Sequence, residues 1–182
     1  MLKNKEVNIT KTVNLTKVSR NLGSELDLDW VLSTQANTSA IERRANSIGA
    51  RRSIKKQHQA AWLIKAITLI DLTTLSGDDT ERRVERLCAK GKKPISKELT
   101  TALGIDKLDI KVGAICVYHE MVKTAVKALK DTNIPVAAVS TGFPAGLSPL
   151  NLRIREIKES VLAGAAEIDI VISRRHVLNG NW

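Results

Sequence analysis

Two carboxylates share one face of a short alternating stretch at residues 167–173. The alternation places Glu167 and Asp169 on one side of a strand and three isoleucines on the other. β-Branched residues on one face are typical of a strand that packs against helices. Buried carboxylates are costly unless they are paired or used. The pattern leaves two alternatives open: an edge strand with a solvated polar face, or a strand whose polar face lines a reaction site.

Three further stretches predict strands with polar residues near their carboxyl ends. These strands are expected over residues 66–73, 112–118 and 136–141, and a helix is expected after each of them. Their polar residues are Asp71, Thr73, Cys116, Ser140 and Thr141. Catalytic residues of parallel α/β folds gather at the carboxyl edge of the sheet. We therefore expect these residues and Asp169 to meet at that edge.

Helical patterns occupy the remaining segments. The sequence predicts a helix capped by Ser24, one long helix over 38–64, and helices near 81–90, 96–103, 120–130 and 150–163. Alternation of strands and helices implies parallel strands with right-handed crossovers. Either an open doubly wound sheet or a piece of a (β/α)8 barrel fits this pattern. No glycine-rich phosphate-binding motif follows a strand, which argues against a nucleotide-binding sheet.

Composition excludes several classes of protein. The chain has 182 residues, of which 43% are hydrophobic, so it is long enough and apolar enough for one folded domain. We expect that domain over 24–182, after a flexible segment over 1–23. Two cysteines, Cys88 and Cys116, make neither a disulfide scaffold nor a metal-binding motif. No apolar run has the length of a membrane span, and a cytoplasmic location is the default expectation.

Basic residues exceed acidic ones, and the formal net charge is +10. The densest basic stretch covers residues 51–56, where a nucleic-acid contact is conceivable. Aromatic residues that stack on bases are missing around it. We therefore predict that this stretch is a solvated helix face and that the protein has neither a nucleic-acid nor a membrane partner.

Five motifs follow one another along the chain. They are Asp71-Leu-Thr-Thr-Leu, Asp78-Asp79-Thr80, Cys116-Val-Tyr, Gly142-Phe-Pro-Ala-Gly146 and Glu167-Ile-Asp169-Ile-Val. In this order and spacing they resemble deoxyribose-phosphate aldolase, most closely its longer animal-type form. The resemblance runs from about Glu25 to the last residue. It implies the first four β/α units of a (β/α)8 TIM barrel with an N-terminal helical extension.

The resemblance also implies a reaction and roles for four residues. The family cleaves 2-deoxyribose 5-phosphate reversibly to glyceraldehyde 3-phosphate and acetaldehyde, in deoxyribose catabolism, through a lysine Schiff base and without a metal or other cofactor. By this resemblance Asp169 is the catalytic proton relay and Asp71 a second catalytic carboxylate. Thr73 and Cys116 bind the substrate, a small phosphorylated sugar. Assembly into a homo-oligomer is left open.

The sequence does not contain the two strand lysines on which the family's reaction depends. The family's Schiff-base lysine lies on the sixth strand and its partner lysine on the seventh, whereas this sequence stops at Trp182, after the fourth predicted strand. Lys65 and Lys111 precede strands and do not lie at the catalytic end. Arg174 and Arg175 could face a phosphate, but an arginine forms no imine.

Two expectations follow from this departure. Four strands cannot close a barrel. We expect a fragment, or a product that is inactive as an aldolase by itself; the alternative is a non-catalytic half-barrel that acts as a binding or assembly module. His119, where the family has a proline, is expected to be a tolerated loop substitution.

Overall fold

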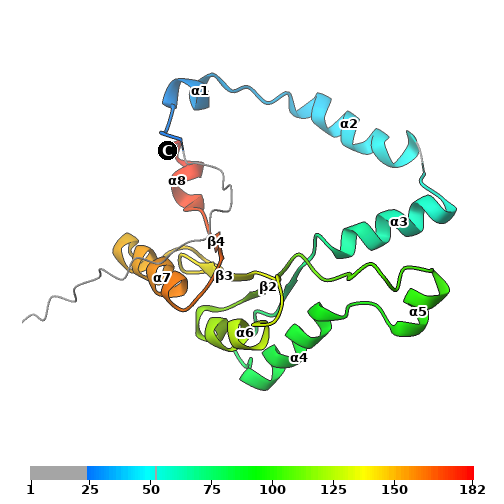
Figure 1. Ribbon diagram of the computed structural model, residues 1–182. Helices are drawn as coiled ribbons and strands as arrows, with labels where there is room; N and C mark the ends of the chain where they lie inside the picture. Colours follow the sequence, from blue (N-terminus) through cyan, green and yellow to red (C-terminus); the bar gives the residue numbers. More distant parts are fainter. Residues whose placement is uncertain (1–23, 52) are drawn as a thin grey trace, which may run out of the picture. The chain divides into compact units, whose positions relative to one another are not determined.

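A computed structural model describes residues 24–51 and 53–182 (Figure 1). The predicted flexible segment 1–23 lies outside the described residues, as does Arg52. The chain divides into two units, Met1–Ile41 and Glu42–Trp182. The expected domain boundary after residue 23 stays a prediction.

The described part of the first unit contains helix α1 (Leu28–Ser33) and the start of α2 (Thr38–Arg51). The predicted cap of α1 is wrong by three residues. Asp27, and not Ser24, is the N-cap, and its side chain accepts a hydrogen bond from the Trp30 N–H at 2.9 Å. A carboxylate at this position satisfies a free N–H group of the first turn and favours the helix dipole.

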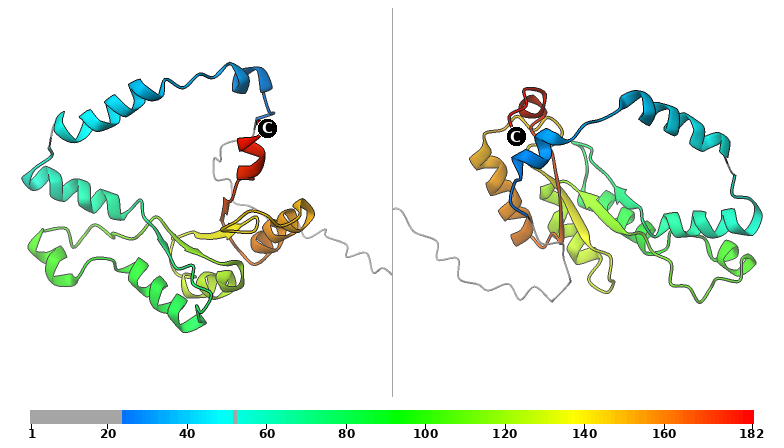
Figure 2. Two further views of the ribbon diagram at one scale, coloured as in Figure 1. Left: turned by 180° about the vertical axis from the view of Figure 1, so that it is seen from behind. Right: turned by 90° about the horizontal axis from the view of Figure 1, so that it is seen from above.

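Four parallel strands alternate with helices in the second unit, in the order β1-β2-β3-β4 (Figures 1 and 2). Its elements are α3 (Lys56–Ile67), β1 (Asp71–Thr73), α4 (Glu81–Lys92), α5 (Lys97–Ala102), β2 (Ala114–Val117), the 3₁₀ turn η1 (His119–Met121), α6 (Val122–Ala128), β3 (Val136–Ser140), α7 (Leu150–Leu162), β4 (Glu167–Ile170) and α8 (Arg174–Leu178). The predicted α/β class with parallel strands is therefore confirmed.

Helices α4, α6 and α7 cover one face of this sheet (Figure 2). The main core lies between them and the strands. Its fully buried members are Val84, Ile115, Val117, Val122, Ala125 and Ala138. Strands β2 and β3 are buried along their whole length, as expected for central strands of a parallel sheet. The opposite face carries a smaller apolar cluster that includes Ala114, Cys116, Ala137 and Val139.

Two predicted elements have different boundaries in the structure. The predicted strand 66–73 is wrong over its first five residues, because α3 continues to Ile67 and the backbone then turns, with Thr68 N–H donating to Lys65 O at 3.1 Å. The predicted single helix 38–64 is divided into α2 and α3. The basic stretch therefore spans a helix break and is no single helix face; its described residues are exposed.

Strand β4 lies at one edge of the described sheet and pairs only with β3. Ile168 packs against the main core, as its alternation predicted. The expectation that all three isoleucines pack against helices is wrong, because Ile170 and Ile172 are each 57% exposed. The strand itself ends at Ile170, and α8, which periodicity did not predict, follows it. Within residues 24–51 and 53–182, no helix combines the length and the apolar character needed to span a membrane.

Candidate active site

The sheet face opposite the helices carries all four residues that the resemblance singled out. Parallel pairing aligns side chains on the same face, and Thr73 pairs with Cys116, which pairs with Ala137. Ala137 pairs in turn with Glu167 on β4. We call this surface the carboxylate face, and its polar members are Asp71, Thr73, Cys116, Glu167 and Asp169.

Asp169 lies closest to the carboxyl edge among these carboxylates. It pairs with Val139, two residues beyond the row that contains Cys116 and Glu167. Its side chain is exposed, so water reaches it. This is the position that the alternation of residues 167–173 predicted, at the edge where parallel α/β folds place their reacting groups.

Asp71 lies further from that edge than the sequence predicted. It begins β1 and pairs with Ala114, the first residue of β2, whereas Thr73 ends β1. The error has the same cause as the misplaced strand boundary, because the apolar run before Asp71 belongs to α3 and a turn. Thr73 donates its hydroxyl to Asp71 O at 2.8 Å, which fixes the Thr73 side chain at the end of the strand.

Cys116 is 4% exposed and forms no disulfide. Burial raises the pKa of the Cys116 thiol, a hydrogen bond with Thr73 lowers it, and the carboxylates of Asp169, Asp71 and Glu167 raise it, for a net increase. A thiol with a raised pKa is protonated at neutral pH and is a poor nucleophile. Its side chain can contact a small ligand, but it is not suited to covalent chemistry.

The carboxylate face is electrostatically one-sided. Three of its residues are acidic, and no residue of the four strands is a lysine or an arginine. Like charges on one surface favour a cation placed among them. The face is therefore suited to hold a positively charged group.

The loop after β3 holds the segment after β4 in place. Thr141 has a positive φ of 62°, and its Oγ1 accepts a hydrogen bond from Val171 N at 2.7 Å and lies 3.0 Å from Val171 O. Glu156 of α7 accepts a hydrogen bond from Gly142 N at 2.9 Å. The sequence predicted the turn over 142–146 but assigned no role to Glu156, because nothing in its helical spacing indicates a partner fourteen residues away.

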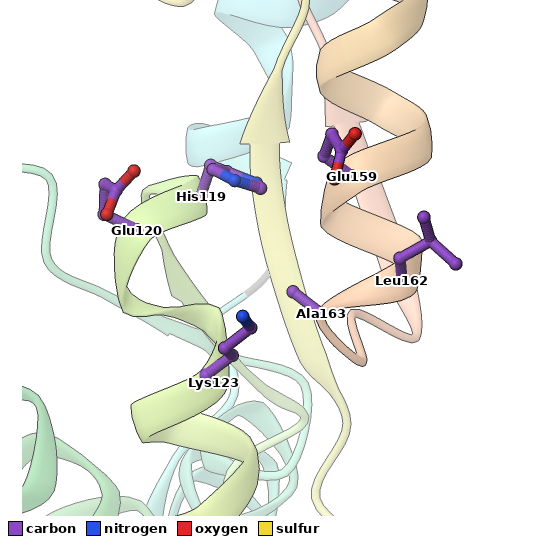
Figure 3. A pocket seen from close by; sticks show the side chains of 6 residues that line it. All are labelled: His119, Glu120, Lys123, Glu159, Leu162 and Ala163. Carbon is purple, nitrogen blue, oxygen red and sulfur yellow. The ribbon is translucent and has the colours of Figure 1, made fainter. Parts of the chain in front are cut away.

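A pocket of about 210 Å³ lies on the other side of the sheet, between α6 and α7 (Figure 3). His119 of η1 and Glu159 of α7 line it from opposite sides. His119 Nδ1 lies 3.0 Å from the hydroxyl of Ser160, which is fully buried. His119 thus links η1 to α7, which is more than the tolerated loop substitution that the sequence suggested. The sheet separates this pocket from Asp169.

Comparison with known proteins adds an independent observation. The chain is 56% identical to "Deoxyribose-phosphate aldolase" of Mus musculus over 162 residues, which cover 88% of this chain and 51% of the mouse protein. It is 53% identical to the protein of the same name from Homo sapiens over 166 residues, which cover 90% and 52%. The chain spans about half the length of the curated relatives it matches. Over that part it is a homologue of deoxyribose-phosphate aldolase, as the motifs predicted.

A solved structure agrees on the fold. A candidate deoxyribose-phosphate aldolase from Coccidioides immitis superposes with a TM-score of 0.51 at 26% identity, over 64% of this chain and 39% of that chain. The four β/α units therefore match part of a TIM barrel. No protein-family model matches the chain.

Proposed function

We propose that this chain is the amino-terminal part of a deoxyribose-phosphate aldolase and supplies its proton-relay carboxylate. One observation carries the proposal: the homology to the mouse and human proteins coincides with the presence of Asp169, Asp71 and Cys116 on the same face of the sheet. The substrate would be 2-deoxyribose 5-phosphate, cleaved to glyceraldehyde 3-phosphate and acetaldehyde.

The role that we propose for Asp169 is proton transfer. The bond that breaks joins the methylene carbon to the hydroxyl-bearing carbon of the sugar, and its electron pair moves onto the carbon next to the imine. The hydroxyl must lose its proton at the same time, and a carboxylate acting through water can accept it. Asp169 is exposed to solvent at the carboxyl edge, which supports this role.

Asp71, Thr73 and Cys116 would stabilise or contact the bound substrate and would not transfer the proton. Asp169 would stabilise the positive charge of an iminium, because opposite charges favour the charged form, and Asp71 on the opposite edge strand would add to the negative charge of the face. Thr73 and Cys116 lie side by side and would contact the sugar. The raised pKa of Cys116 favours such a contact over nucleophilic attack, since the thiol stays protonated.

The amine that forms the Schiff base has to come from outside these four strands, since none of them contains a lysine. The purified 182-residue chain is therefore expected to have no retro-aldol activity. This expectation is checked by a coupled assay for glyceraldehyde 3-phosphate, and turnover by the chain alone would refute it.

Complementation tests the role of Asp169. The chain would be produced together with the half of the mouse enzyme that it does not match, which is expected to restore cleavage of 2-deoxyribose 5-phosphate. In this split enzyme Asp169→Asn should lower kcat by about 10²–10⁴-fold, the usual contribution of a general acid–base group. Glu167→Gln is the matched control, because it removes a carboxylate from the same face of the same strand.

The outcomes separate the alternatives. Loss of activity in D169N but not in E167Q supports the relay role. Equal effects of both substitutions would mean that Asp169 contributes only to the general charge of the face. A complex that forms without activity would favour the alternative that this chain is a binding or assembly module.

A further inference from the structure

The loops after β3 and β4 form a pocket of about 320 Å³ whose residues have no role in the proposed proton transfer. Arg153 of α7 and Arg175 and His176 of α8 line it, together with the hydroxyl groups of Ser148 and Ser173. Among the described residues that line it, none carries a carboxylate. A concave site with several cationic groups and no acid attracts anions.

Arg153 is held in position by one hydrogen bond, and another of its hydrogen-bond donors has no partner among the described residues. Its Nη1 donates a hydrogen bond to Ser173 Oγ at 2.7 Å, which ties α7 to the residue before α8. Its Nε is buried and has no hydrogen-bond partner among the described residues. Buried donors without partners are costly and uncommon. That N–H is enclosed by the protein, so a ligand would reach Arg153 through the part of its side chain that lines the pocket.

His176 and α7 add further donors. The side-chain amide Nδ2 of Asn181 lies 2.9 Å from His176 Nδ1, a contact that orients the imidazole ring at the pocket. Helix α7 begins after Pro149 with no side-chain cap and no acidic residue in its first turn. The free N–H groups of a thirteen-residue helix therefore face the same region with a partial positive charge.

We infer that this pocket binds a phosphate group, either as inorganic phosphate or as the terminal group of a small phosphate monoester. Guanidinium groups match the geometry of tetrahedral oxyanions, and a doubly charged phosphate gains more from two arginine side chains than a carboxylate does. The pocket is built from loop and helix residues and not from the carboxylate face. The inference therefore does not depend on the proposed aldolase reaction.

Isothermal titration of the 182-residue chain at fixed ionic strength tests the inference, with inorganic phosphate and glycerol 3-phosphate as separate probes. Arg175→Gln is the main variant, because Arg175 is exposed and its loss should not affect folding. It should weaken phosphate binding by about tenfold, the usual effect of removing one charge-assisted hydrogen bond. Arg155→Gln is the matched control: Arg155 lies on α7 outside the pocket, and its side chain is 77% exposed.

Three results would overturn the inference: no phosphate binding by the unmodified chain, unchanged binding in R175Q, or equal weakening in R155Q. A second pocket variant, His176→Gln, should also weaken binding, with circular dichroism as the check on folding. Binding of both probes identifies the terminal phosphate of a monoester as a ligand, and binding of inorganic phosphate alone restricts the site to the free ion. D169N should bind phosphate as the unmodified chain does, which separates this site from the proposed active site.

Discussion

The side chain of Asp79 forms several interactions that stabilise the loop between β1 and α4. Its side chain is only 4% exposed. It accepts hydrogen bonds from the Thr74 hydroxyl at 2.9 Å and from Ser76 N at 3.0 Å, and it pairs with Arg83 at 3.2 Å. Burial raises the pKa of Asp79. The hydrogen bonds from Ser76, Thr74 and Arg83 together lower this pKa by more than burial raises it, so the pKa lies below the ordinary value. The ionised form is therefore the one that stabilises the fold.

Replacing Asp79 by asparagine should lower the free energy of unfolding at neutral pH by about 1–3 kcal/mol, because hydrogen bonds to a charged group are lost. The depressed pKa gives the sign of the pH effect. The contribution of Asp79 is full above the pKa of the unfolded chain, about 3.9, and it is lost as the pH falls through the lower pKa of the folded state. Urea unfolding measured from neutral to acidic pH checks both points.

Asp78→Asn is the control for this prediction. Asp78 pairs with the same arginine, at 3.0 Å, but its side chain is 74% exposed. Ion pairs at the surface contribute little, so D78N should leave stability nearly unchanged. Equal losses in D78N and D79N would mean that Arg83, and not the buried hydrogen bonds, accounts for the effect.

The conformation of the loop between β3 and α7 depends on a single glycine, Gly146. Gly146 has a φ of +68°, and a Cβ added to it would lie 2.8 Å from Val171 Cγ1. Gly146→Ala should therefore be destabilising for two reasons, the left-handed backbone and the contact with the segment after β4. We expect a loss of about 2–4 kcal/mol in the free energy of unfolding, measured by chemical denaturation.

Gly104→Ala separates the two causes. Gly104 has nearly the same φ, +67°, and an added Cβ would meet no atom within 4 Å. G104A should lose only about 1 kcal/mol, from the backbone conformation alone. If the two variants were equally destabilised, the contact between Gly146 and Val171 would have no energetic role.

The same elements define what sequence could and could not predict. Strands β2, β3 and β4 were located because their alternating or continuous apolar patterns are short and end at glycine, proline or charged residues. The start of β1 was missed because the mostly apolar run over residues 66–70 fits the end of a helix as well as a strand. At the site, Asp169 and Cys116 followed from the pattern and the resemblance. The Thr141–Val171 bonds did not, since they join residues thirty positions apart.

On the scale of the whole second unit, large apolar side chains remain in contact with solvent. Leu69 is 68% exposed, and Ile170 and Ile172 are each 57% exposed at the β4 edge of the sheet. Burying such a side chain is worth about 1.5–3 kcal/mol. Apolar groups along a sheet edge favour association.

The 182-residue chain should therefore associate in a concentration-dependent way, as measured by sedimentation velocity. The double variant Ile170→Lys and Ile172→Lys should shift the distribution towards the monomer by removing the apolar edge and adding charge. Leu99→Lys is the control, because Leu99 is 50% exposed but lies on α5, away from the strands. A monomer at all concentrations, or an equal shift with L99K, would contradict this prediction.

The order of the strands in the sheet is also their order along the chain. Each strand pairs with the one made just before it, and the helix between them covers the new pair. Contacts between segments that are close in sequence form quickly, whereas distant ones delay folding. Folding also begins at the amino-terminal end while the chain is still being synthesised. A nascent chain can thus assemble this sheet one strand at a time, with β4 as the last of the described strands to be added.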